Sequence, residues 1–185
     1  MVRPGKKMKV GRNIQVGDAT GTVVEIRENG NRLIEWDKEI DIHAHGSLAL
    51  PHYMGRDSDN TDTERYQTVF AEEEGAIAAP TAGLHFTPEV LEKISHTFLT
   101  LHVGIGTFRP VKAELIEDHE MHSERYSVSS ETADRINQAK RVTAVGTTCT
   151  RVLESLARDS NTLTVSQGET DIFIYPGFEF KAVDR

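Results

Sequence analysis

The sequence predicts a mixed α/β protein whose first part is a small antiparallel β-barrel or sheet. Three observations lead to this prediction. Residues 1–55 contain short runs of β-branched and apolar residues between glycine-rich turns, residues 56–64 are acidic and polar, and residues 65–185 alternate helical and strand patterns. We therefore expect a β-barrel-like domain over residues 1–55, an exposed linker over residues 56–64 and an α/β domain over residues 65–185.

The composition is that of a globular protein with one domain, or one domain and a small companion. The chain has 185 residues, of which 37% are hydrophobic. Its apolar runs stay below the roughly 20 residues that span a bilayer, and its first twelve residues lack the apolar centre of a secretory signal. Cys149 is the single cysteine. A disulfide framework is thereby excluded, and we expect a cytoplasmic location without membrane attachment.

Charge is unevenly distributed along the chain. The formal net charge of −8 argues against a general polyanion binder. Residues 1–55 nevertheless carry eight Lys or Arg against seven Asp or Glu, and residues 3–12 hold five cations and no acid. This basic start fits either a solvated tail or an edge that contacts phosphates.

Three segments of the first 55 residues have the composition of strands. They are residues 14–16, 22–27 and 32–36. Asn29 and Gly30 lie between the last two segments and are typical of a hairpin turn. Such tight spacing suits a small antiparallel barrel or sheet that ends near residues 48–51.

Beyond residue 64, helical and strand patterns alternate. Thr87 followed by Pro88 predicts a helix that begins there, is capped by the threonine hydroxyl and runs to about Ser95. The other predicted elements are a strand over residues 98–103, a helix over 130–140, a strand over 142–145 and a strand over 171–175.

A glycine turn joins the predicted strand at residues 142–145 to a helix with one apolar face. The apolar positions of this helix are Cys149, Val152, Leu153 and Leu156. Free N–H groups at a helix start attract anions, so residues 146–148 are able to hold a carboxylate or phosphate, with Arg151 nearby. A plain capped helix explains the same pattern.

Two runs have neither a helical nor a strand period. Residues 80–86 (PTAGLHF) and 101–110 (LHVGIGTFRP) each set a histidine, His85 or His102, among glycines, a threonine and a phenylalanine. Glycine lets the backbone approach a ligand closely, imidazole transfers protons near neutral pH, and a hydroxyl donates or accepts hydrogen bonds. We expect both runs to line a pocket.

His119, His122 and Glu124 form a second candidate site. Two imidazoles three positions apart, with a carboxylate two positions further on, are able to coordinate zinc, which would indicate a metal-dependent hydrolase. A polar, hydrogen-bonded loop explains these residues equally well.

Six segments occur in a fixed order along the chain: residues 65–69 (RYQTV), 80–86, 101–111, 119–124 (HEMHSE), 145–148 with Arg151, and 173–177 (FIYPG). Together they resemble the S-adenosylmethionine:tRNA ribosyltransferase-isomerases of queuosine biosynthesis. The likeness is strong over residues 65–184 and looser over the first 55, where residues 2–6 (VRPGK) resemble the family's entry into an inserted β-barrel. The resemblance implies an α/β domain with a small antiparallel β-barrel domain inserted in it.

The chain also departs from that family. It begins inside the family's α/β domain and stops after residues 181–184 (KAVD), before an Asn-Phe-His-Leu-Pro motif. The segments near residues 95–97 and 140–142 contain fewer residues than the corresponding segments of the family. We therefore expect a partial sequence whose α/β domain is truncated at its C-terminal end.

The resemblance implies that S-adenosylmethionine donates its ribosyl portion instead of its methyl group. The ribosyl moiety moves to 7-aminomethyl-7-deazaguanine in the tRNA anticodon and isomerises to epoxyqueuosine, while adenine and methionine leave. The sulfonium acidifies the C5′ protons, so a base starts the rearrangement and an acid helps adenine leave. The expected partners are S-adenosylmethionine, as a co-substrate, and a tRNA with a queuosine-type anticodon. We expect no tightly bound cofactor, no metal and a monomeric protein.

Site residues are assigned from these blocks. The candidates for catalysis are His85, His102 and Thr107. The candidates for substrate binding are Arg65, Thr81, Gly83, Phe86, Gly104, Gly106, Phe108, Arg109, His119, His122, Glu124, Gly146, Thr147, Thr148, Arg151 and Tyr175. Among these, residues 146–148 and Arg151 are expected at the methionine carboxylate, the phenylalanines at a base, and Arg65 and Arg109 at tRNA phosphates or acidic groups.

A third interpretation belongs to a different class of function. The barrel-like start with its basic edge would hold the anticodon arm, while a truncated α/β part would be inert. The chain would then be a non-catalytic tRNA-binding fragment. Salt-dependent tRNA affinity without adenine release would distinguish it from the enzyme.

Overall fold

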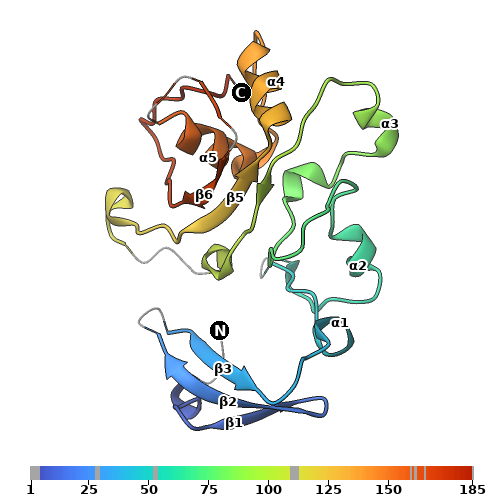
Figure 1. Ribbon diagram of the computed structural model, residues 1–185, viewed down its shortest axis with the longest axis vertical. Coiled ribbons are helices and arrows are strands. Elements are labelled where there is room, and N and C mark those ends of the chain that lie inside the picture. Colours follow the sequence, from blue (N-terminus) through green and yellow to red (C-terminus); the bar gives the residue numbers. More distant parts are fainter. Residues whose placement is uncertain are drawn as a thin grey trace. The chain divides into compact units, whose positions relative to one another are not determined.

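The computed structural model describes residues 5–27, 30–51, 54–108, 113–158, 160, 162–164 and 166–184. The chain divides into two compact units between Leu48 and Ala49. Each unit contains one three-stranded antiparallel sheet (Figure 1). The strands of the first sheet follow one another along the chain, whereas helices separate the strands of the second. The fold is therefore mixed α/β, as the sequence predicted.

The first unit is built on the sheet β1-β2-β3. Its strands are β1 (Asn13–Val16), β2 (Ala19–Ile26) and β3 (Arg32–Trp36), and both pairs are antiparallel. Two short helices accompany them, η1 (Gly5–Lys7) and α1 (Ile42–His45). All three predicted strands are confirmed, with β2 beginning three residues earlier than expected. The predicted hairpin turn includes Asn29, which lies outside the described residues.

One face of this sheet is covered by its own side chains. Ala19 and Val23 of β2 are buried, and Gly21 between them lies under the side chains of Ile34 and Trp36. A methyl group on Gly21 would lie 2.7 Å from the Trp36 ring. The described strands leave β1 and β3 as open edges, so they form an open sheet and not the expected closed barrel. Three strands are too few to close on themselves, since even small barrels use about eight or, in partly open forms, five.

The second unit begins with short helices and turns. Among the described residues, helical segments before its sheet include α2 (Asp62–Arg65), η3 (Thr81–Gly83) and α3 (Pro88–Leu91). The helix predicted to reach Ser95 is wrong in length, because after Leu91 the chain continues in tighter turns. Thr87 is its N-cap by position, yet its side chain makes no capping hydrogen bond. The Thr87 side chain instead hydrogen-bonds to Glu89 and lowers the pKa of that carboxyl group.

Asp62 is the buried residue of the segment 56–64, most of which is exposed. Its carboxylate is 6% exposed and accepts two hydrogen bonds from the Arg56 guanidinium, at 2.6 and 2.7 Å. The backbone N–H of Asp59 donates to the same carboxylate at 2.9 Å. These contacts lower the pKa of Asp62 to about 2. The acidic segment therefore folds around a paired carboxylate, which sequence composition does not reveal.

The sheet of the second unit has the order β4-β5-β6. Its strands are β4 (Thr100–Leu101), β5 (Glu124–Val128) and β6 (Ser166–Thr170), all antiparallel to their neighbours. Two short helices, η4 (Ile105–Phe108) and η5 (Ile116–Asp118), lie between β4 and β5. The strand predicted over residues 98–103 is thus reduced to two paired residues.

Two other predicted strands are wrong. Residues 142–145 form no strand, although Val142 exchanges hydrogen bonds with Asp184 at 2.7 and 2.9 Å. Residues 171–175 also form none, because the chain pairs with β5 just before them, through β6. Both segments have strand-like composition, and only the availability of a partner edge decides which segment pairs.

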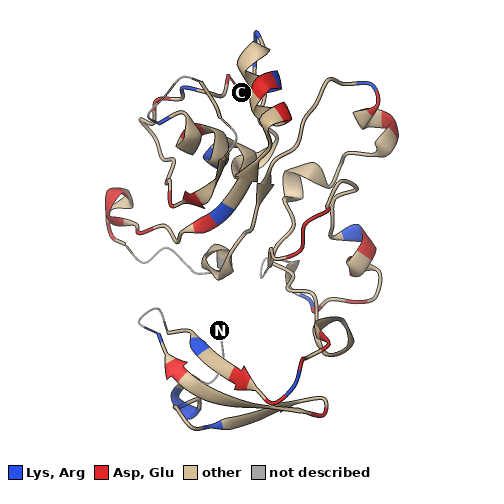
Figure 2. Ribbon diagram, in the orientation of Figure 1, with Lys and Arg blue, Asp and Glu red and all other residues tan. Residues whose placement is uncertain are grey.

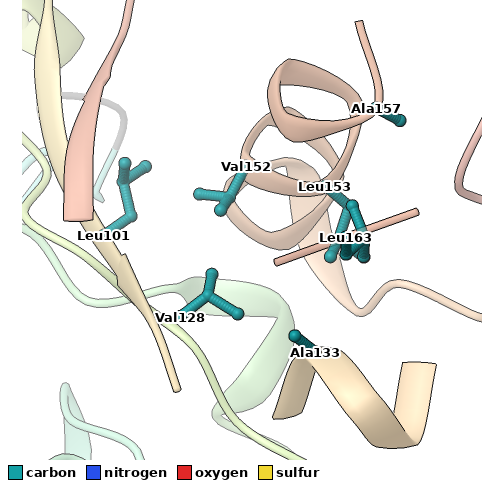
Figure 3. Packing of buried hydrophobic residues seen from close by; sticks show 7 residues of the cluster. All are labelled: Leu101, Val128, Ala133, Val152, Leu153, Ala157 and Leu163. Carbon is teal, nitrogen blue, oxygen red and sulfur yellow. The ribbon is translucent and has the colours of Figure 1, made fainter. Parts of the chain in front are cut away.

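Helices α4 (Ser130–Gln138) and α5 (Gly146–Leu156) confirm the two longest predicted helices. Ser129 caps α4, since its Oγ accepts the N–H of Thr132 at 3.1 Å. The helices pack on the sheet, and Val152 of α5 and Val128 of β5 lie in the space between helix and strands (Figure 3). The buried residues of this core are Leu101, Val128, Ala133, Val152, Leu153, Ala157 and Leu163.

Candidate functional site

The candidate site of the second unit is organised by an ion pair between Glu124 and Arg151. Glu124 begins β5 and Arg151 lies in the middle of α5, and their side chains are 6% and 14% exposed. Arg151 Nη1 contacts Glu124 Oε2. The other carboxylate oxygen, Oε1, accepts the backbone N–H of Gly104 at 2.8 Å. One carboxylate therefore joins α5 to the glycine-histidine run that follows β4.

The remaining donors of Arg151 are only partly used. Its Nε donates to the backbone carbonyl of Ile172 at 3.1 Å, which ties the helix to the segment after β6. Its Nη2 is buried and has no hydrogen-bond partner among the described residues. An unsatisfied buried donor costs roughly 1–3 kcal/mol. Arg151 is therefore rigidly held and retains capacity to bind an oxygen acceptor.

His102 is positioned by the backbone directly after β4. Its N–H donates to the carbonyl of Arg125 at 2.8 Å, and Val103 accepts the N–H of Ile77 at 3.0 Å. The ring packs on Gly75, where an added methyl group would lie 2.9 Å from Nδ1. This Nδ1 is buried and has no hydrogen-bond partner in the described part of the chain. The imidazole thus has one ring nitrogen that is desolvated and uncommitted.

The run 80–86 lies beside the start of α5. Gly83 in η3 is buried against Thr68 and Phe70, and a methyl group added there would lie 2.9 Å from the Phe70 ring. Gly146 has φ +86°, and its missing side chain would lie 3.1 Å from Ala82 Cβ. Two motifs that are more than sixty residues apart in sequence are therefore adjacent. Gly83 is favoured by close packing and Gly146 by its positive φ.

The other predicted residues differ in how far they are exposed. Thr81, His85, Thr107, Thr147 and Arg65 are exposed, whereas Phe86 and Thr148 are partly buried. Gly106 lies against the His122 ring, where a methyl group would be 2.4 Å from Cδ2. The Phe108 side chain and Arg109 lie outside the described residues. His85 and Thr107 are therefore less enclosed than His102.

His119 and Tyr175 belong to a short aromatic row. The His119 and Phe173 rings are 4.8 Å apart between centroids in an edge-on arrangement, and the Phe173 and Tyr175 rings are 5.6 Å apart. Tyr175 is the exposed end of the row. The three rings are tilted relative to one another, and Tyr175 leaves an aromatic edge open to a ligand.

The structure does not support the zinc interpretation of His119, His122 and Glu124. Glu124 is committed to Arg151 and Gly104, and His119 packs edge-on against Phe173. In the described ranges, no three His, Cys, Asp or Glu side chains are grouped so that they could hold a metal ion. Cys149 of α5 is largely covered, and burial raises the pKa of its thiol, which disfavours a thiolate nucleophile.

Comparison with known proteins decides the family. The profile of a family described as "Queuosine biosynthesis protein" matches residues 1–185, the whole chain. The chain belongs to this family. Three similar relatives, from Desulfitobacterium hafniense, Finegoldia magna and Staphylococcus epidermidis, are 46%, 48% and 47% identical over 199 residues. Each is named S-adenosylmethionine:tRNA ribosyltransferase-isomerase.

The queuosine family match covers all of this chain but only part of each relative. The alignments include 100% of this chain and 58%, 57% and 58% of the three relatives. The chain therefore spans rather more than half the length of the curated relatives it matches. Over the residues that the structure describes, no helix has the length and apolar character needed to cross a membrane.

Several residues of this region were missed by sequence reasoning. Thr68, Phe70 and Gly75 provide the surfaces on which Gly83 and His102 pack, and Ile172 contributes a carbonyl to Arg151. Glu124 was assigned to substrate or metal, whereas it binds Arg151 and Gly104. The only signal for Gly75 is a glycine after three consecutive glutamates. Such contacts join distant segments and have no local sequence pattern.

Proposed function

We propose that this chain carries the S-adenosylmethionine site of a tRNA ribosyltransferase-isomerase of queuosine biosynthesis. The observation that carries the proposal is the full-length family match, with relatives of that name at 46–48% identity. The reaction would transfer the ribosyl moiety of S-adenosylmethionine to 7-aminomethyl-7-deazaguanine in a tRNA anticodon. Epoxyqueuosine, adenine and methionine would be the products.

The methionine part of S-adenosylmethionine suits the surroundings of Arg151. Glu124 already neutralises the guanidinium, so this position disfavours a multiply charged anion and favours a group that balances its own charge. The amino-acid end of methionine is such a group, since its carboxylate lies beside a positively charged ammonium. We place this carboxylate at Arg151 Nη2, with residues 146–148 at the helix start providing a favourable dipole.

His102 is our candidate for proton transfer at the nucleoside part. The base removes a C5′ proton, which the adjacent sulfonium makes acidic, and the electron pair of the glycosidic bond leaves with adenine, which takes a proton. The aminomethyl nitrogen of the tRNA base forms a bond to a ribosyl carbon and gives up a proton. A ribosyl oxygen closes the epoxide as the carbon–sulfur bond breaks with its electron pair on the methionine sulfur. His102 has a desolvated, uncommitted Nδ1 beside Gly75. His85 is the second candidate, and Thr107 would orient the ligand.

The other assignments complete the proposed site. Gly104 would let the ligand approach the backbone, whereas Gly83 and Gly106 would shape the site through their close packing on Phe70 and His122. Aromatic contacts to adenine or deazaguanine would come from Phe86, Phe108 and Tyr175, and phosphate or acidic-group contacts from Arg65 and Arg109. We also propose that residues 1–55 are part of an inserted β-barrel domain, that residues 65–185 belong to the catalytic α/β domain, and that the enzyme works as a cytoplasmic monomer.

The test is a turnover measurement with two tRNA substrates. The protein is incubated with S-adenosylmethionine and tRNA that contains 7-aminomethyl-7-deazaguanine, and released adenine is quantified together with the mass of the modified nucleoside. Adenine and epoxyqueuosine should form in equal amounts, and tRNA with guanine at that position should yield neither. Tight, salt-dependent tRNA binding without adenine release would instead identify a non-catalytic tRNA-binding fragment.

The metal-dependent hydrolase interpretation predicts a different result. It requires stoichiometric zinc in the purified protein and loss of activity on chelation. Turnover that is insensitive to chelators would exclude it.

A further inference from the structure

Arg32 of β3 organises the basic segment at the start of the chain. Its Nε donates to the carbonyl of Met8 at 3.1 Å and its Nη2 to that of Gly5 at 2.8 Å, while Nη1 contacts the carbonyl of Gly30. One guanidinium therefore fastens η1 and the following turn to the sheet. A planar fork of fixed donors is well suited to holding several carbonyls at once.

The same segment is also hydrogen-bonded to β2. The N–H of Gly11 donates to the carbonyl of Val23 at 2.8 Å, and the N–H of Val23 donates to that of Arg12 at 3.0 Å. Residues 5–12, which we call the basic segment, are thus attached to the sheet at both ends. The expectation of a freely solvated tail does not apply to these residues.

Four cations project from the basic segment. Lys6, Lys7, Lys9 and Arg12 are exposed, and within the described ranges no acidic side chain forms an ion pair with any of them. Elsewhere in this unit, Lys38 pairs with Asp18 at 2.6 Å and Arg27 with Glu25 at 3.7 Å. Figure 2 shows the basic positions at η1 and just before β1, with the acidic end of β2 next to η1 in this view. The basic segment is therefore a local concentration of unpaired positive charge.

We propose that the basic segment binds the phosphate backbone of the tRNA substrate. This inference rests on the proposed function, which supplies the polyanion. The whole chain has a net charge of −8, so phosphate binding needs a local surface from which acids are absent. Cations that are held in place by Arg32 lose less freedom on binding than cations on a disordered tail. Contacts of this kind give affinity and salt dependence without reading the base sequence.

The test replaces the four cations together. The variant Lys6→Gln, Lys7→Gln, Lys9→Gln, Arg12→Gln should bind tRNA at least about tenfold more weakly at 0.1 M salt, and the slope of log affinity against log salt should fall by about 3. The side chains are exposed, so the fold should be unaffected. In turnover, the KM for tRNA should rise, while the KM for S-adenosylmethionine and the kcat at saturating tRNA should stay the same.

A matched control separates the surface from the overall charge. Lys93, Lys140, Arg141 and Arg158 are exposed cations of the second unit, and their joint replacement by Gln changes the net charge equally. This control should retain most of the tRNA affinity and salt slope. An equal loss in both variants, or no loss in the first, would overturn the proposal. If the wild-type protein releases adenine while the basic-segment variant binds tRNA normally, the surface is wrong and the proposed function stands.

Arg32→Lys tests the role of the clamp. Lysine keeps the charge but loses the planar fork that holds the Gly5 and Met8 carbonyls. The variant should bind tRNA several-fold more weakly with an almost unchanged salt slope. Unaltered affinity would contradict the part of the proposal in which Arg32 pre-organises the surface.

Discussion

Glu124 and Arg151 form a largely buried ion pair that joins the first residue of β5 to the centre of α5. The same carboxylate holds the Gly104 N–H. Removing one member of a buried pair leaves an uncompensated charge, which typically costs about 3–5 kcal/mol, whereas removing both costs much less. This difference makes it possible to separate a structural role from a functional one.

Glu124→Gln and Arg151→Gln should each lower the free energy of unfolding by about 3 kcal/mol, and the double variant should lose less than the sum of the two. Urea unfolding measures all three. If Arg151 also binds the substrate carboxylate, the double variant should regain stability but should still show a raised KM for S-adenosylmethionine. Recovery of KM along with stability would limit the pair to a structural role.

His102→Ala should lower the rate of adenine release at saturating substrates by at least about 100-fold, the usual effect of losing a general base or acid. Its Nδ1 is the uncommitted, buried imidazole nitrogen described above. His96→Ala is the control, since its ring contacts Phe98 and its Nδ1 the carbonyl of Ile94. Unchanged turnover in the first variant would remove His102 from the chemistry.

The paired carboxylate of Asp62 should make stability depend on pH. The Arg56 guanidinium and the Asp59 N–H lower the pKa of Asp62 to about 2, below the value of about 3.9 for an unfolded chain. The unfolded state therefore binds a proton first, so the stabilisation is complete above about pH 4 and is lost as the pH falls towards about 2.

Urea unfolding at pH 5 and pH 3 tests this dependence. Asp62→Asn should be less stable than the wild type at pH 5, and the difference should shrink at pH 3. Asp57→Asn, which alters an exposed neighbour, should leave the pH dependence as it is. Equal pH dependence in the wild type and Asp62→Asn would contradict the role of the ion pair.

Gly146→Ala should destabilise the second unit for two reasons. The residue has φ +86°, a conformation that costs a non-glycine residue roughly 1–2 kcal/mol, and the new methyl group would lie 3.1 Å from Ala82 Cβ. Gly177 has φ +99°, and a methyl group added there would meet no atom within 4 Å. The loss of stability in Gly177→Ala therefore reports only the cost of the backbone conformation. Thermal unfolding should show the larger loss for Gly146→Ala. A loss of stability no greater than that of Gly177→Ala would mean that η3 shifts to make room for the added methyl group.

Glu154 should anchor the segment near residue 182. Its side chain is buried and its carboxylate accepts the N–H groups of Lys181, Ala182 and Val183 at 2.9, 3.0 and 2.9 Å. Glu154→Ala leaves three donors without their acceptor and should cost about 3 kcal/mol or more. Glu154→Gln keeps one acceptor oxygen and should cost less. Hydrogen exchange at these three amides should accelerate most in the alanine variant.

Local sequence patterns were sufficient to predict those helices and strands whose own residues show a turn, a cap or an apolar face. The strands of the first unit follow β-branched runs between turns, α4 begins at a serine cap, and α5 shows one apolar face after a glycine. The six ordered segments were sufficient for the family, because a profile sums weak preferences over the whole chain. The helices and strands are thus predicted from residues close together in the sequence, and the family from segments spread over the whole chain.

The sequence alone thus determined the family, the main helices and the strands of the first sheet. Only the tertiary structure decided that β6 and not residues 171–175 pairs with β5, that Asp62 is buried, and that Glu124 holds Arg151 and Gly104. The reason is physical. A strand-like run or a carboxylate is satisfied by any suitable edge or cation, and which one it meets depends on the packing of segments far apart in the chain.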